Sequence, residues 1–168
     1  MTNTLNFALD FLNQGIGVIP VTYRDKRPDA RLLPKSVDGT PTWEPYKHQL
    51  PSPEAVTAWL QAGSHNYGVV AGWQGLTILD FDDASEYTSW LLWVSKVGGK
   101  ARFVATNAFR VQTARGVHVY VRISAPGANQ KFGKVDVKRN GYVLGPGSIH
   151  PSGAEYTALQ SALIFPVI

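Results

Sequence analysis

The chain has 168 residues, of which 44% are hydrophobic and 17% charged, so it is long enough and apolar enough for one folded domain, residues 1–168. It contains no cysteine, which excludes a disulfide framework and a thiolate metal site. No apolar stretch approaches the length of a membrane span, and the first residues lack the pattern of a signal peptide, so we expect a cytoplasmic protein with no membrane partner.

Three elements are predicted in the first third of the chain. Asn3 to Asn13 carries apolar residues at helical spacing, and Gly17 to Pro20 has the composition of a short buried strand. Thr22 to Pro53 shows no period and is expected to be a long irregular segment. It contains Lys26-Arg27-Pro28 and the segment from Trp43 to Lys47, where aromatic and basic residues interleave. They could contact a nucleic-acid strand, or the aromatic rings could pin the loop to the body of the protein.

Ser52, followed by Pro53 and Glu54, has the features of a helix start, because serine caps the first turn and proline fits its first position. We expect this helix to run to about Ala62 and to end at Gly63.

A predicted hairpin follows. Two apolar runs, Tyr67 to Ala71 and Leu76 to Phe81, flank the turn residues Gly72 to Gly75. Asp83 is then placed to cap a second amphipathic helix, Ala84 to Val97. The core face of this helix is expected to consist of Trp90, Leu91, Trp93 and Val94.

The second half of the chain is predicted to consist of short strands separated mostly by glycine and proline. These strands are Arg102 to Ala105, Phe109 to Gln112, Val117 to Ile123, Lys134 to Val137 and Tyr142 to Leu144. Asn140-Gly141 is a strong signal for a two-residue hairpin turn between the last two. Only an apolar tail is expected at 157–168.

Charge in this half is strongly one-sided. From Tyr87 to Ala154 the only acidic residue is Asp136. The same stretch holds the basic residues Lys96, Lys100, Arg102, Arg110, Arg115, Arg122, Lys131, Lys134, Lys138 and Arg139. Such an imbalance favours a polyanionic partner, nucleic acid or nucleotide ahead of a membrane. A basic surface without a partner is the alternative.

Three carboxylates are the candidate metal ligands. Asp80 and Asp82 alternate with Phe81, so they point to the same side of a strand, about 7 Å apart along the chain. Two like charges at a strand end require a compensating cation, and oxygen ligands favour Mg²⁺ or Mn²⁺ over zinc. A solvated strand end followed by a helix cap is the alternative. Asp136, between Val135 and Val137, repeats the pattern.

Two further segments are candidates for binding phosphate. In the alternating strand Val117 to Ile123, His118, Tyr120 and Arg122 share the predicted polar face, opposite the valines. Arg115 and the backbone of Gly116 would add donors just before it.

The loop from Gly145 to Gly153 offers backbone amides, Ser148 and His150 to an anion. It is equally compatible with a rigid turn.

Four motifs, in their order along the chain, resemble those of the bifunctional DNA primase–polymerase (prim-pol) domain. They are Asp80-Phe81-Asp82, Thr113 to His118, Val135-Asp136-Val137 and Pro146 to Gly153. That domain belongs to the archaeo-eukaryotic primase superfamily and is frequent in plasmid and phage replication proteins. The resemblance covers residues 5–156, including the Trp43-x-x-Tyr46 segment and the Ser52-Pro53-Glu54 helix start.

The resemblance implies an α/β (α+β) fold with two lobes, an N-terminal helix-and-strand lobe packed on an RRM-like antiparallel sheet, and an active site in the cleft between them. It also implies metal-dependent nucleotidyl transfer, in which a DNA primase/polymerase makes or extends primers on single-stranded DNA from nucleoside triphosphates. Its partners would be template, primer and triphosphates, with a replicative helicase or an accessory primase domain as a further partner.

The implied roles fall on eight residues. Asp80, Asp82 and Asp136 would bind two Mg²⁺ or Mn²⁺ ions and, with His118, form the catalytic set. The implied nucleotide-binding residues are Arg115, Gly116, His118, Lys138 and Ser148. Many relatives carry a serine where this chain has Gly116. Two competing hypotheses remain: a metal-dependent nuclease using the same carboxylates, and a non-catalytic nucleic-acid-binding replication module.

Overall fold

A computed structural model describes residues 3–61 and 65–168. Its helices are α1 (Asn3–Asn13), α2 (Pro53–Gln61), α3 (Ala84–Val97) and α4 (Gly99–Asn107), with short 3-10 turns η1 (Glu44–Lys47) and η2 (Trp73–Gly75). Its strands are β1 (Val18–Val21), β2 (Asn66–Val70), β3 (Leu76–Phe81), β4 (Arg110–Gln112), β5 (Val117–Arg122), β6 (Gln130–Phe132), β7 (Val135–Lys138), β8 (Tyr142–Leu144) and β9 (Thr157–Ala158). The predicted end of α2, at Ala62 and Gly63, lies outside the described residues.

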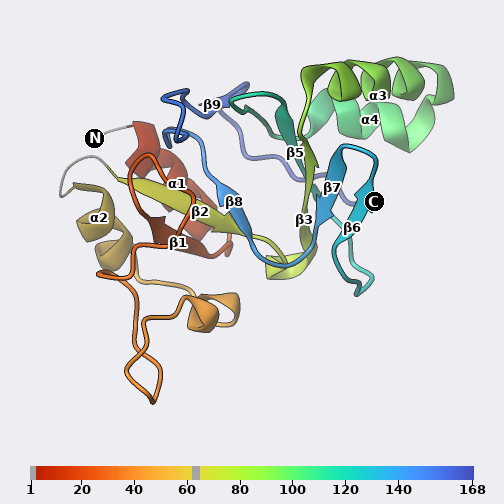
Figure 1. The fold of residues 1–168 in the computed structure, drawn as a ribbon. Coiled ribbons are helices and arrows are strands. Elements are labelled where there is room, and N and C mark those ends of the chain that lie inside the picture. The colour runs from red at the N-terminus through yellow and green to blue at the C-terminus, as the bar shows by residue number, and fades with distance from the viewer. Residues whose placement is uncertain (1–2, 62–64) are drawn as a thin grey trace.

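The strands form two antiparallel sheets, which confirms the expected mixed α/β class. The smaller sheet has the order β1-β2-β8 and the larger one the order β6-β7-β3-β5-β4-β9. Figure 1 shows α1 and α2 beside the small sheet, and α3 and α4 at the far end of the large one.

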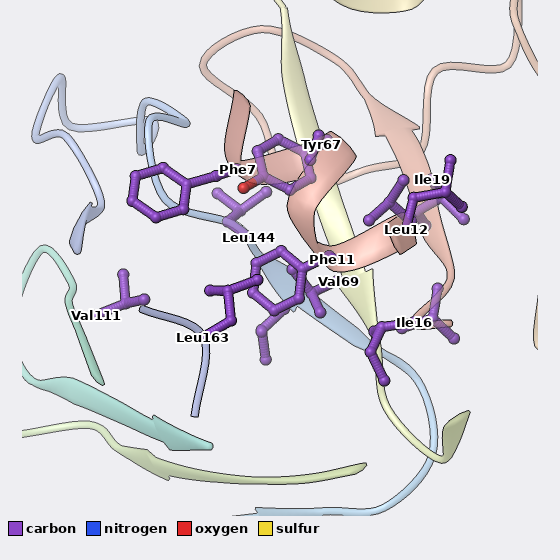
Figure 2. Packing of buried hydrophobic residues seen from close by; sticks show 14 of the residues in the cluster. Phe7, Phe11, Leu12, Ile16, Ile19, Tyr67, Val69, Val111, Leu144 and Leu163 are labelled. Carbon is purple, nitrogen blue, oxygen red and sulfur yellow. The ribbon is translucent and has the colours of Figure 1, made fainter. Parts of the chain in front are cut away.

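The main hydrophobic core joins α1 and the small sheet to one face of the large sheet. Phe11 of α1 is fully buried, and its ring lies 5.8 Å from those of both Phe109 and Tyr120. Figure 2 shows the α1 side chains directed toward Tyr67 and Val69 of β2, with Leu163 close by. Residues 157–168 therefore contribute strand β9 and part of this core.

A second, smaller cluster fills the opposite face of the large sheet. Phe81 and the valines of β5 pack there against Val104 and Ala108 from α4 and its C-terminal end, and Trp90 of α3 lies against them. The predicted alternation of β5 is confirmed. The prediction that one face of this strand is polar is wrong in part, because Tyr120 on that face is fully buried in the main core.

Both predicted hairpins are wrong, for a shared reason. The turn between β2 and β3 and the turn between β7 and β8 carry the chain from one sheet to the other, side by side, with the Ala71 amide donating to the Gly141 carbonyl at 2.9 Å. β2 pairs with β8 in the small sheet, and β3 pairs with β7 in the large one. The glycines supply positive φ angles for a bend between sheets instead of a hairpin reversal.

The predicted strand at 102–105 is also wrong, since these residues belong to α4. α3 ends at Gly98, whose φ of 68° breaks the helix, and a second helix begins at once. Ala101, Arg102 and Ala105 are good helix formers. Val104 and Ala108, four residues apart, lie on the same side of the helix and both pack into the second cluster.

The start of α3 is as predicted, because the Asp83 carboxylate accepts the Ser85 amide at 2.7 Å. Its predicted core face is partly wrong. Val94 is buried, but Trp93 is 55% exposed. Tyr87 and Trp90 are three residues apart and already fill the side that faces the sheet. The capping of α2 by Ser52 is confirmed by the Ala55 amide, which donates to the Ser52 hydroxyl at 3.1 Å.

Candidate active site

Three adjacent strands of the large sheet bring the predicted acidic residues and the histidine into one row. Asp136 of β7 is the direct cross-strand partner of Asp80 in β3, and Asp80 is in turn the partner of His118 in β5. Lys131 of β6 lies opposite Asp136 and extends the row. Asp82 follows two residues after Asp80 and therefore points to the same side. Asp80, Asp82, Asp136 and His118 thus converge on one face of the sheet.

Two lysines neutralise the carboxylates of this row. Lys138 Nζ lies 3.1 Å from Asp80 Oδ2, and His118 Nε2 lies 3.4 Å from Asp80 Oδ1. Lys131 Nζ lies 2.9 Å from Asp136 Oδ1 and 3.8 Å from Asp82 Oδ2. Because like charges on paired strands repel, these cations stabilise the row.

Asp80 is the most deeply placed of the three carboxylates, with 14% of its side chain exposed. Burial alone would raise the pKa of its carboxyl. The hydrogen bond and charge of His118, followed by those of Lys138, outweigh burial and hold this pKa well below its ordinary value. Asp80 is therefore ionised at neutral pH, the state that a metal ligand requires.

The donor set fits a hard divalent cation in its chemistry, since carboxylate oxygens are the ligands that Mg²⁺ and Mn²⁺ prefer. Within the described residues, no three acidic or histidine side chains are already close enough together to hold an ion. The Lys131 ammonium instead stands between Asp82 and Asp136. This position marks where two carboxylates converge on one cation. Lys131 is 59% exposed and on a flexible stem, so it can swing away.

A basic cavity opens beside the row. Its lining combines Lys26 and Arg115 with Asp80, Asp82, His118, His150, Tyr156 and residues 113–114. The pKa of His150 is lowered mainly by burial and, to a smaller extent, by the charges of Lys26 and Arg115. Burial raises the pKa of Tyr156 to about 12, so its hydroxyl remains a protonated donor at neutral pH. A second cavity, lined by Lys26, Asp80 and His118 together with β8, draws on both sheets.

Arg115 and Lys138, both predicted to bind nucleotide, thus lie beside the carboxylates. Gly116, also predicted to bind nucleotide, instead forms part of its own turn. Its amide donates to Thr113 Oγ1 at 2.9 Å, inside its own turn. A Cβ on Gly116 would stand 1.7 Å from the Phe81 carbonyl oxygen, so no other residue fits without moving β3 or the turn. This contact explains why the position is occupied by glycine in this chain.

Ser148 is not brought to the row. It is fully buried, and its hydroxyl accepts the Tyr67 amide at 3.2 Å and donates to the Tyr67 carbonyl at 3.3 Å. In this structure it ties the 145–153 loop to β2. His150 of the same loop does line the basic cavity.

The aromatic residues of the long loop pack against the protein, which favours the pinning hypothesis. The Trp43 ring meets Tyr142 edge-on at 5.3 Å, and Tyr46 meets Trp59 at 5.8 Å. The Trp73 indole donates to the Tyr46 carbonyl at 2.9 Å. The same loop delivers Lys26, which sequence reasoning did not place in the site. Its only signal was the basic run Lys26-Arg27-Pro28.

The mixed α/β fold, with its two antiparallel sheets, defines the class as an α+β primase-type domain. Residues 8–166 match the family model described as bifunctional DNA primase/polymerase, N-terminal, and the chain belongs to that family. Its general function is therefore that of a DNA primase/polymerase, with DNA and nucleotides as partners. A search of curated proteins found no match. None of the helices in the described residues is long and apolar enough to cross a membrane.

Proposed function

We propose that the chain catalyses template-directed nucleotidyl transfer from nucleoside triphosphates at the Asp80–Asp136–His118 row. The observation that carries the proposal is the cross-strand register, which sets Asp136 and His118 on either side of Asp80. Asp80 and His118 also line the basic cavity. In the reaction, the 3′-hydroxyl oxygen of a primer attacks the α-phosphorus of the triphosphate. A new phosphodiester bond forms, the bond to the β-phosphate oxygen breaks, and pyrophosphate leaves.

Asp80, Asp82 and Asp136 would hold two Mg²⁺ or Mn²⁺ ions once Lys131 moves off the carboxylates. Bound there, the ions would activate the attacking hydroxyl and neutralise the leaving pyrophosphate. The ligand type, the ionised state of Asp80 and the ammonium that already bridges Asp82 and Asp136 support this assignment.

The protein's own cations would position the triphosphate. His118, Arg115 and Lys26 converge on the basic cavity beside the row, where they can donate to phosphate oxygens. Lys138 keeps Asp80 ionised and oriented through its 3.1 Å contact. Because charge builds on the phosphoryl oxygens, fixed donors of this kind supply most of the catalytic stabilisation.

The test is a gel assay with single-stranded template, labelled triphosphates and Mg²⁺ or Mn²⁺, run with and without an annealed primer. Products that lengthen with triphosphate are expected, and Asp80→Ala/Asp82→Ala should lower their rate by about a thousandfold or more. Asp10→Asn, an exposed carboxylate on α1, is the matched control and should retain full activity. The unprimed lane decides whether the chain starts primers unaided.

Shortened DNA without triphosphate would instead identify a nuclease. Salt-dependent DNA binding with no chemistry in any lane would identify a binding module. Either result contradicts the proposal, as does full activity in the double variant.

A further inference from the structure

The helical hairpin formed by α3 and α4 exposes an unusual number of large apolar side chains. Leu92, Trp93 and Val97 of α3 and Phe103 of α4 are each between 55% and 61% exposed. Their neighbours Trp90 and Val104 already fill the contact with the large sheet, and Val94 is buried as well. The exposed set is therefore not needed for the hydrophobic core.

The same hairpin is basic. Lys96, Lys100 and Arg102 are exposed and interleave with Trp93 and Phe103 in the sequence. Glu86 is the only acidic residue between 84 and 107. Within residues 3–61 and 65–168, none of these three cations forms an ion pair. They remain available to an anionic partner.

Exposed aromatic rings among unpaired cations match the chemistry of single-stranded nucleic acid, in which bases stack on rings while phosphates meet lysine and arginine. A docking face for an apolar protein surface would leave the three cations facing that surface without partners. We propose that Trp93 and Phe103, with Lys96, Lys100 and Arg102, form a platform for the single-stranded template.

The hairpin begins next to the candidate active site, although it covers the face of the large sheet opposite the carboxylate row. A hollow lined by Asp82, Asp83, Ala84, Arg115 and Lys134 lies at the start of α3, directly beyond the carboxylate row. Lys134 pairs with Asp83 at 3.2 Å on its wall. Trp93 is ten residues beyond Asp83, which is about 15 Å along the helix axis. A strand leaving the row past Arg115 would pass round the end of the large sheet at the start of α3 and then run along the helix to Trp93.

The assignment of this strand as template rests on the proposed function, but binding itself is testable without catalysis. The assay is fluorescence anisotropy of a labelled single-stranded oligonucleotide, longer than the roughly 4–16 nucleotides that one OB fold covers, without metal or triphosphate. Trp93→Ala/Phe103→Ala should weaken binding by about tenfold or more. Trp93→Phe, which keeps a stacking ring, should bind nearly as well as the natural chain.

The matched control is Leu92→Ala, which removes an equally exposed side chain without a ring and should leave affinity unchanged. Lys96→Gln/Lys100→Gln should reduce the slope of log affinity against log salt by about 1.4, whereas Lys35→Gln in the long loop should leave the slope unchanged.

Unchanged affinity in Trp93→Ala/Phe103→Ala would overturn the proposal. Equal sensitivity to Leu92→Ala, together with a dimer in sedimentation that this variant dissociates, would also overturn it and identify an interface between copies of the chain. Loss of binding in the aromatic variant from a chain that extends no primer would support the platform while contradicting the proposed function. If the natural chain extends primers while Trp93→Ala/Phe103→Ala binds the template with unchanged affinity, the result would support the proposed function and contradict the platform.

Discussion

The two faces of the large sheet are built from alternating residues of the same strands, yet they differ in what covers them. On the face toward α3 and α4, Phe81 and the valines of β5 form a closed apolar layer. On the other face, Ile78 and Tyr120 are sealed under α1 and the small sheet, but Asp80 and its neighbours emerge beyond that cover. The site therefore lies at the edge of the apolar layer on one face of the large sheet. The apolar packing on the opposite face holds the backbone of the site in place.

The largest effect on stability is expected from opening the closed face. Phe81 is 1% exposed and packs against Tyr87 and Trp90 at 5.4 and 5.3 Å. Phe81→Ala should therefore lower the free energy of unfolding by about 3–5 kcal/mol in urea denaturation. Leu92→Ala, on the solvent side of α3, should change it by less than about 0.5 kcal/mol. Similar losses in both variants would show that the two sides of α3 do not differ as described.

The turn at Gly116 packs tightly against the Phe81 carbonyl, so an added side chain there should lower stability more than one in an open turn. Gly116→Ala sets a methyl group against the Phe81 carbonyl and should cost about 1–3 kcal/mol in the same measurement. The control is Gly127→Ala, whose added methyl meets the end of the flexible Arg139 side chain and should cost less than about 1 kcal/mol. A tolerated Gly116→Ala would contradict the tight contact.

Acid should remove the stability that the ionised Asp80 carboxylate contributes on the open face of the sheet. The pKa of Asp80 is lower in the folded protein than its ordinary value of 3.8. Its contribution to stability is therefore complete above about pH 4 and is lost as the pH falls further, because the unfolded state then takes up a proton that the folded carboxylate does not bind. Urea midpoints measured through this range should fall more steeply for the natural chain than for Asp80→Asn. Parallel curves would mean that His118 and Lys138 do not stabilise the ionised carboxylate.

The smallest effect is expected at Tyr120, in the sealed part of the open face. Its hydroxyl is buried and has no hydrogen-bond partner within the described residues. Tyr120→Phe should thus leave the free energy of unfolding unchanged or raise it by up to about 1 kcal/mol. A loss of more than about 1 kcal/mol would reveal a partner for this hydroxyl, such as a buried water shared with His118.

Local patterns predicted the elements that carry the site, but not how they pair. The alternation around Phe81 and the capping by Asp83 are properties of a few neighbouring residues, so the sequence alone predicted both. The two glycine turns favoured hairpins locally, and only the packing of two sheets makes them crossings. Lys131 opposite Asp136 depends on strand register. Trp93 was assigned to the core because hydrophobicity does not say which of several apolar residues the sheet has room to bury.

The central claim is that the carboxylate row at the open end of this sheet holds the catalytic cations. It is tested most directly by titrating Mn²⁺ into the natural chain and into Asp80→Asn, Asp136→Asn and Asp10→Asn by calorimetry, with a nucleoside triphosphate present. We predict binding that weakens by about tenfold or more in Asp80→Asn and Asp136→Asn and stays unchanged in Asp10→Asn. Equal affinity in all four proteins, or no binding in the natural chain, would contradict the account.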